Sequence, residues 1–238
     1  MRISRIWAVL IAALVFFLIA NAPAQILKPY LKNSFNFPFT LSGSIWNGSV
    51  QSKYFNKASW QVNALSLLLL KILIDIKVEI DSKNKLNANA EMSPFNKLML
   101  NNINGVLTTQ YLQQFLPNAP LLLSSNINIV QTNAKWNRLL PPNTPSEAEG
   151  SLTFEKVNFL GENLGNYRFN FVYFDRSLAG DVTSTASSAV EASIKVNISN
   201  SNLLTLDGDI LPKTKGLQSI FRELKIDPSI SYYYQLGH

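Results

Sequence analysis

The sequence predicts a mainly β protein in which a single N-terminal transmembrane helix precedes an antiparallel, strongly curved sheet with few short helices. Three observations support this fold class. Residues 6–20 form an uncharged apolar run behind two arginines. After residue 38, apolar and polar residues alternate with the period of two that is typical of strands. Only short segments space their apolar residues at helical intervals, so helices contribute little to the fold.

The N-terminal segment has the features of a membrane anchor. Arg2 and Arg5 precede the apolar run Ile6 to Ala20, and a helix from Arg5 to Ala24 would reach about 30 Å, the thickness of a bilayer core. The positive-inside rule then places residues 1–5 in the cytoplasm and the rest of the chain on the other side of the membrane.

Trp7 would lie at the headgroup level, where tryptophan is enriched. We therefore expect residues 1–24 to be a cytoplasmic stub and transmembrane signal anchor, and residues 25–238 to form a β-rich domain on the other side of the membrane. A cleaved signal peptide is the alternative, because Ala22-Pro23-Ala24 has the small-x-small form of a cleavage site. In both interpretations the body of the chain leaves the cytoplasm.

The body of the chain reads as a series of one-sided strands. In "KILIDIKVEID" the isoleucines and Val78 alternate with charged residues, so residues 72–80 form a strand with one apolar face and one polar face. The same alternation recurs in residues 121–129, 152–156, 167–173 and 190–198.

Turns and helices separate these strands. Asn104-Gly105 and Asp207-Gly208 are turn-forming pairs. Residues 108–117 and 215–226 have helical spacing and stop near a proline. The stretch "PPNTPSEAEG", residues 141–150, is a possible boundary between two halves of the domain.

Composition excludes several kinds of chemistry. The chain has no cysteine, and its single histidine is the terminal residue His238, so disulfides, thiolate sites and histidine-based triads have no basis. The net charge of +6 comes from dispersed residues, whereas a nucleic-acid interface needs clustered basic residues with exposed aromatics. We expect a chain that is not an enzyme, binds no cofactor, metal or nucleic acid, and contacts a membrane.

Two tryptophans lie on short, glycine-interrupted strands. "LSGSIWNGSV" contains Gly43, Trp46 and Gly48, and Trp60 follows just before a leucine-rich run at residues 65–70. Together with the N-terminal segment, this order resembles the type II secretion system protein N (GspN) family. The C-terminal half, with "LLTLDGDILPK" and a closing strand that ends near a glycine, is similar to the ending of that family.

The resemblance implies structural roles for Gly43, Trp46, Gly48, Trp60, Gly208, Pro212 and Gly237. It also implies a non-catalytic accessory protein of the inner membrane, with residues 25–238 as a periplasmic domain. Such a protein works with other inner-membrane secretion components in exporting folded proteins across the outer membrane.

A more distant resemblance, to AsmA-like envelope proteins, implies instead an open β fold with an apolar groove that binds or moves lipid. A sealed apolar face would favour the scaffold, and an open apolar trough would favour the lipid conduit.

Overall fold

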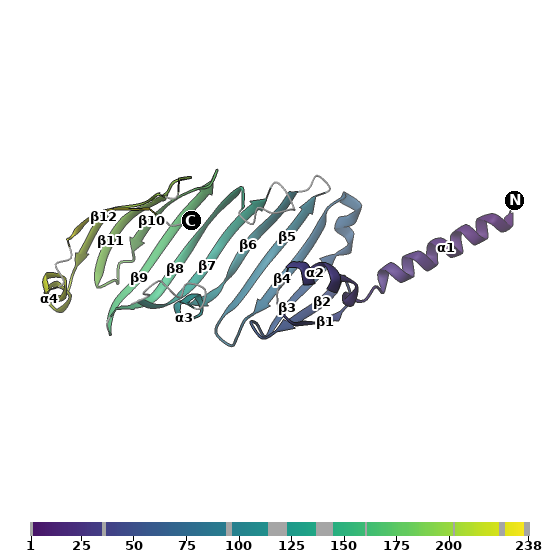
Figure 1. Ribbon diagram of the computed structural model, residues 1–238, viewed down its shortest axis with the longest axis horizontal. Coiled ribbons are helices and arrows are strands. Elements are labelled where there is room, and N and C mark those ends of the chain that lie inside the picture. The colour runs from purple at the N-terminus through teal and green to yellow at the C-terminus, as the bar shows by residue number, and fades with distance from the viewer. Residues whose placement is uncertain are drawn as a thin grey trace.

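A computed structural model of the chain describes residues 2–34, 37–93, 97–113, 123–136, 145–159, 161–201, 203–223 and 227–235. Thirteen strands in these ranges form one antiparallel sheet, and their order in space follows their order in the chain from β1 to β13 (Figure 1). The mainly β, antiparallel architecture is thus confirmed. Because β1 and β13 lie at opposite edges, the sheet is open.

The strands are β1 (Phe39–Gly43), β2 (Asn47–Ser52), β3 (Lys57–Asn63), β4 (Ile72–Glu79), β5 (Lys85–Ser93), β6 (Lys97–Thr108), β7 (Leu123–Trp136), β8 (Glu147–Phe159), β9 (Glu162–Phe174), β10 (Ser177–Ser184), β11 (Val190–Ile198), β12 (Leu203–Pro212) and β13 (Ser229–Gln235). The helices are α1 (Arg2–Ala20), α2 (Lys28–Ser34), α3 (Thr109–Gln113) and α4 (Lys215–Glu223), with short 3₁₀ helices η1 (Ala24–Leu27) and η2 (Ala64–Leu69).

The prediction of an N-terminal transmembrane helix is wrong. Across the described part of the chain, no helix combines the length and the apolarity needed to cross a membrane. Helix α1 ends at Ala20 instead of continuing to Ala24, because the next residues turn and begin η1. Its uncharged portion, Ile6 to Ala20, therefore extends about 22 Å, less than the roughly 30 Å of a bilayer core.

One face of the sheet carries a continuous apolar row. Each strand contributes one residue to this row, and that residue is the register partner of the row residue in the next strand. All residues of the row are half-buried. The row is Leu41, Val50, Ala58, Val78, Leu86, Gly105, Ile129, Leu152, Phe169, Val182, Ile194, Gly208 and Ile230. The period-two alternation of single strands thus becomes one apolar stripe across the whole sheet.

The expected turns at Asn104-Gly105 and Asp207-Gly208 are wrong, since both pairs lie inside strands, in β6 and β12. Their glycines belong to the apolar row. A Cβ on Gly105 would lie 2.9 Å from the Cα of Leu86. Glycine is therefore used here for close cross-strand approach, a role that the same dipeptide does not reveal in the sequence.

Both expected helices begin where the sequence predicts them, within one residue. The helix expected over 108–117 begins as α3, although residues 114–122 lie outside the described residues. The one expected over 215–226 is α4, with residues 224–226 also outside the described ranges. Residues 141–144 of the expected boundary are likewise not described, and β7 pairs directly with β8 beside it. The division into halves stays a prediction.

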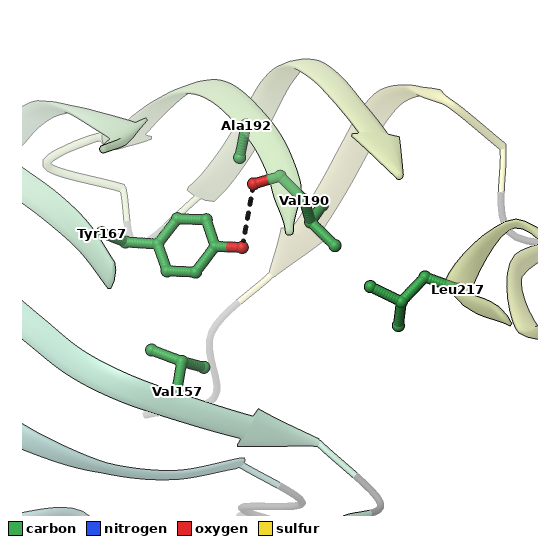
Figure 2. Close-up of a cluster of buried hydrophobic side chains, with 5 residues drawn as sticks. All are labelled: Val157, Tyr167, Val190, Ala192 and Leu217. Atoms are coloured by element: carbon green, nitrogen blue, oxygen red, sulfur yellow. Dashed lines mark hydrogen bonds between the residues drawn. The ribbon is translucent and has the colours of Figure 1, made fainter. Parts of the chain in front are cut away.

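The best-buried apolar cluster lies at the C-terminal end of the sheet. It joins β8, β9, β11 and α4 through Val157, Tyr167, Val190, Ala192 and Leu217. Figure 2 shows Leu217 pointing from α4 toward Val190, with Val157 across from the Tyr167 ring. Among the described residues no large side chain is completely buried, so this cluster is a local core at one end of an otherwise half-exposed apolar face.

Candidate functional site

The two tryptophans singled out in the sequence lie together at the N-terminal end of the sheet. The indole N–H of Trp46 donates to the carbonyl of Ile19, in the last turn of α1, at 2.8 Å. The indole N–H of Trp60 donates to the carbonyl of Ile45 at 3.0 Å. Both rings therefore hold backbone carbonyls that belong to other elements.

The glycines on either side of Trp46 make this packing possible. Gly48 is buried and is the register partner of both Gly43 and Trp60. A Cβ on Gly48 would overlap the Trp60 ring and would lie 2.7 Å from the carbonyl oxygen of Ser44. Gly43 has a φ of +85°, a conformation that side chains rarely adopt.

Backbone contacts complete the attachment of the N-terminal segment. The Ile45 N–H donates to the Ala22 carbonyl at 3.0 Å, and Pro23 forms an isolated antiparallel bridge with Ser44. Ala24 is completely buried. We call residues 19–25, residues 43–48 and Trp60 the N-terminal joint; it fixes where α1 leaves the sheet.

Helix α1 projects from this end of the sheet (Figure 1). Eight of its large apolar side chains are exposed: Trp7, Leu10, Ile11, Leu14, Val15, Phe17, Leu18 and Ile19. Arg2, Arg5 and Ile6 lie within the helix and Ala20 is its last residue. Their expected roles in anchoring depend on the transmembrane helix, which the structure contradicts.

The remaining predicted residues lie elsewhere. Gly208 and Pro212 are on β12, near the opposite edge of the sheet. Gly208 is the register partner of Ile194 and Ile230. Gly237 lies outside the described residues. The structure therefore brings Gly43, Trp46, Gly48 and Trp60 together but separates them from Gly208 and Pro212, and the structural role expected of each stays a prediction.

A cavity of about 520 Å³ lies at the C-terminal end of the sheet. Its walls include Leu112 from α3, Phe154 from β8, Ile194 from β11, Ile210 from β12 and Phe221 from α4. Among the described residues that line it, none carries a charge. In the sequence, these five residues follow the ordinary apolar pattern of a strand or a helix. No local feature of the sequence therefore distinguishes a cavity from a filled core here.

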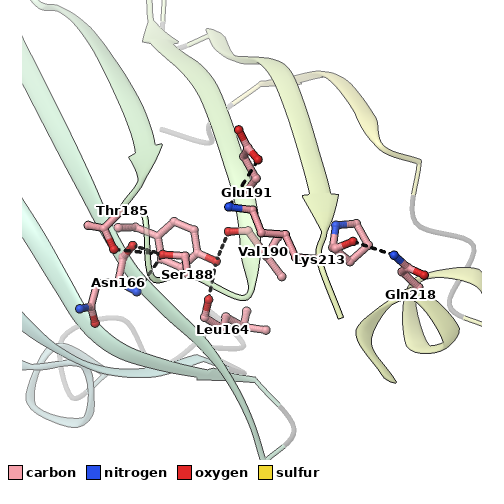
Figure 3. A network of polar contacts seen from close by, with 10 residues as sticks. Leu164, Asn166, Thr185, Ser188, Val190, Glu191, Lys213 and Gln218 are labelled. Atoms are coloured by element: carbon pink, nitrogen blue, oxygen red, sulfur yellow. Dashed lines mark hydrogen bonds and ion pairs between the residues drawn. The ribbon is translucent and has the colours of Figure 1, made fainter. Parts of the chain in front are cut away.

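A network of polar contacts, here called the polar clamp, lies next to the lining residues Leu164 and Val190 of this cavity (Figure 3). The Ser188 hydroxyl is buried and donates to the Asn166 carbonyl at 2.6 Å, while the Asn166 N–H donates back to it at 3.2 Å. The Ala189 N–H donates to the Leu164 carbonyl at 2.9 Å. These bonds tie the β10–β11 connection to β9, so the position of Val190 in the cavity wall is fixed.

Tyr167 joins the clamp to the cavity. Its hydroxyl lies 3.0 Å from the carbonyls of both Leu164 and Val190, which share its single proton. Burial disfavours the charged phenolate and raises the pKa of Tyr167 to about 12. The group is thus a neutral hydrogen-bond donor at any physiological pH.

The described residues contain no group of three or more side chains that could hold a metal ion. The described part of the protein has two apolar features available for binding, the exposed helix α1 at one end of the sheet and the cavity at the other end.

A comparison with protein families identifies a match over most of the chain. The family described as "Type II secretion system (T2SS), protein N" matches residues 40–224. No curated protein and no solved structure matches the chain. The matched range covers the sheet from β1 through α4 and includes every predicted signature residue except Gly237. The alternative resemblance to AsmA-like proteins receives no support from these comparisons.

Proposed function

The chain belongs to the family of type II secretion system protein N, and from this membership we propose that it is a non-catalytic accessory component of the type II secretion system. It acts in the bacterial envelope, with the β-rich body, residues 25–238, in the periplasm. Its partners are other inner-membrane components of the same system. Its role is to support the export of folded proteins across the outer membrane.

The single observation that carries this proposal is the family match over residues 40–224. The geometry of the N-terminal end agrees with a protein that works by contact. Large exposed apolar surfaces mark sites of interaction, and α1 exposes Phe17, Leu14 and Leu18 among other large apolar side chains. The bond from Trp46 to Ile19 sets the direction of this helix relative to the sheet.

The test is a pull-down of the tagged full-length chain from its native host after mild crosslinking, with mass spectrometry of the recovered proteins. Deletion of the gene is measured in parallel, by the fraction of a secreted enzyme that reaches the medium. We expect recovery of other secretion components and accumulation of the enzyme in the periplasm. Normal secretion together with recovery of no secretion component would overturn the proposal.

A pair of variants tests the contact surface. The double substitution Leu14→Ser and Leu18→Ser removes apolar side chains from α1. Leu211→Ser changes a leucine on β12 that is 50% exposed, close to the 57% of Leu14. Recovery of partners is expected to fall several-fold for the first and to stay unchanged for the second. Equal recovery for both would show that α1 does not make the contact.

A further inference from the structure

The cavity at the C-terminal end of the sheet has the chemistry of a ligand site. Its volume of about 520 Å³ lies in the range of small-molecule pockets, roughly 300–1,000 Å³. An engineered apolar cavity of about 150 Å³ stays dry and takes a benzene molecule. By that scale, this cavity has room for a chain of roughly 12 to 20 carbon atoms.

The hydrogen-bonding groups on the cavity wall are largely engaged within the protein. The Thr109 hydroxyl donates to the Ser125 carbonyl at 3.3 Å and accepts from the Ser125 N–H at 3.0 Å. The Tyr167 hydroxyl is bonded to the carbonyls of Leu164 and Val190. With no charged residue in the described lining, the wall offers a polar ligand very little.

This lining distinguishes between two kinds of occupant. An inserted protein segment would bring backbone N–H and C=O groups, and each would be costly to bury without a partner. A hydrocarbon chain brings no such groups and gains from every methylene that leaves water. We propose that the cavity binds the hydrocarbon chain of a single fatty acyl or alkyl amphiphile, tail first, with its polar head outside.

The site lies far from the N-terminal joint, on strands β7 to β12 beside α3 and α4. It is separate from the contact surface that α1 provides. The proposal therefore stands apart from the secretion role: a chain that still recovers its secretion partners but binds no acyl chain would fail here alone.

The experiment uses the purified full-length chain and hexadecanoic acid that carries a photoreactive diazirine at its terminal carbon. After irradiation, mass spectrometry locates the labelled peptides. We expect labels on β8, β10, β11 or α4, since the tail tip enters the cavity. Neutral hexadecanol, which shares only the chain, should compete for this labelling.

Two matched pairs of variants test the cavity directly. Ala192→Leu fills it from the buried wall of β11, whereas Ala179→Leu makes the same change on an exposed position of β10. Val182→Phe fills it from β10, and Val172→Phe is its control on the exposed face of β9. Cavity labelling should fall at least tenfold in Ala192→Leu and Val182→Phe, and should be unchanged in both controls.

Each variant is first checked for a native circular dichroism spectrum. If Ala192→Leu does not fold, the comparison of Val182→Phe with Val172→Phe tests the proposal. Labels confined to the exposed apolar side chains of α1 would overturn the proposal. Undiminished cavity labelling in the folded, filled variants would do the same. Competition by a leucine-rich strand peptide but not by hexadecanol would assign the cavity to a protein segment instead.

Discussion

The indole N–H groups of Trp46 and Trp60 each bond a backbone carbonyl of another segment. The last carbonyls of a helix have no partner within the helix, and the Trp46 indole donates to one of them at Ile19. The Trp60 indole donates to Ile45 in the short connection between β1 and β2. Tryptophan suits both positions because one side chain supplies a large apolar ring and a directed donor.

Gly48→Ala tests how tightly the joint is packed. The added Cβ would overlap the Trp60 ring and press on the Ser44 carbonyl, so we expect a loss of about 1–3 kcal/mol in the free energy of unfolding. Urea unfolding measures it. Gly216→Ala is the control, because a Cβ there meets nothing within 4 Å; inside α4 it should be neutral or stabilising by up to about 1 kcal/mol. Equal midpoints for the two variants would contradict close packing at Gly48.

Tyr167→Phe tests the buried hydroxyl. Loss of its hydrogen bond should reduce the free energy of unfolding at pH 8 by about 0.5–1.5 kcal/mol. Burial raises the pKa of Tyr167 from 10.0 to about 12. When the pKa of a group is higher in the folded than in the unfolded state, its contribution to stability is fully present below the unfolded pKa. This contribution is lost as the pH rises through the folded pKa. The wild-type advantage should therefore shrink between pH 10 and pH 12.

The measurement is chemical unfolding of both proteins across this range. Tyr232→Phe, at a tyrosine that is 66% exposed, is the control and should follow the wild type. A constant difference between wild type and Tyr167→Phe at all pH values would contradict burial of a titrating hydroxyl.

At the scale of elements, short helices are held by packing more than by their own propensity. Isolated helices of this length are marginal in water, so α4 depends on its contacts with the sheet. Leu217 is 2% exposed against the cluster around Val190. Gln218 Nε2 donates to the Pro212 carbonyl at 3.2 Å (Figure 3). These contacts hold α4 against β11 and β12.

Leu217→Ala should detach α4. Truncation of a buried leucine costs about 2–5 kcal/mol, and the effect should appear as a lower melting temperature and faster hydrogen exchange in α4. Leu211→Ala, at a leucine that is 50% exposed, should stay within about 0.5 kcal/mol of the wild type. Slow exchange in α4 of the Leu217→Ala protein would show that other contacts hold the helix.

At the scale of the whole molecule, the sheet depends on strand pairing and on the apolar row that crosses it. All thirteen strands pair with their neighbours in the chain, and the row is half-buried in every strand. The sheet is therefore stabilised along its length by cross-strand pairs, and the described residues add a buried apolar cluster at its C-terminal end.

Ile76→Asn tests whether this face stabilises the sheet. Ile76 is half-buried between its register partners Trp60 and Ala88. A polar side chain there should reduce the free energy of unfolding by about 1–3 kcal/mol. Lys77→Asn changes the next residue, on the exposed face, and should stay within about 0.5 kcal/mol. Equal urea midpoints for the two variants would show that the two faces contribute alike.

The sequence by itself determined the class of the sheet. The strand predicted for residues 72–80 is observed as β4, Ile72–Glu79, with Ile74, Ile76 and Val78 half-buried and Asp75 and Lys77 exposed. A period of two is a local property, so it survives whatever the strand pairs with. The order of Gly43, Trp46, Gly48 and Trp60 likewise pointed to the family that the comparison shows.

Only the tertiary structure decided the features that depend on neighbours distant in the chain. Asn104-Gly105 has the composition of a turn, yet Gly105 lies in β6 opposite Leu86 and Ile129. Helix α1 stops at Ala20 because the next residues bond to Ser44 and Ile45, and the apolar run alone does not reveal that end. The cavity between β8, β11 and α4 arises from segments tens of residues apart, and local periodicity carries no information about such a meeting.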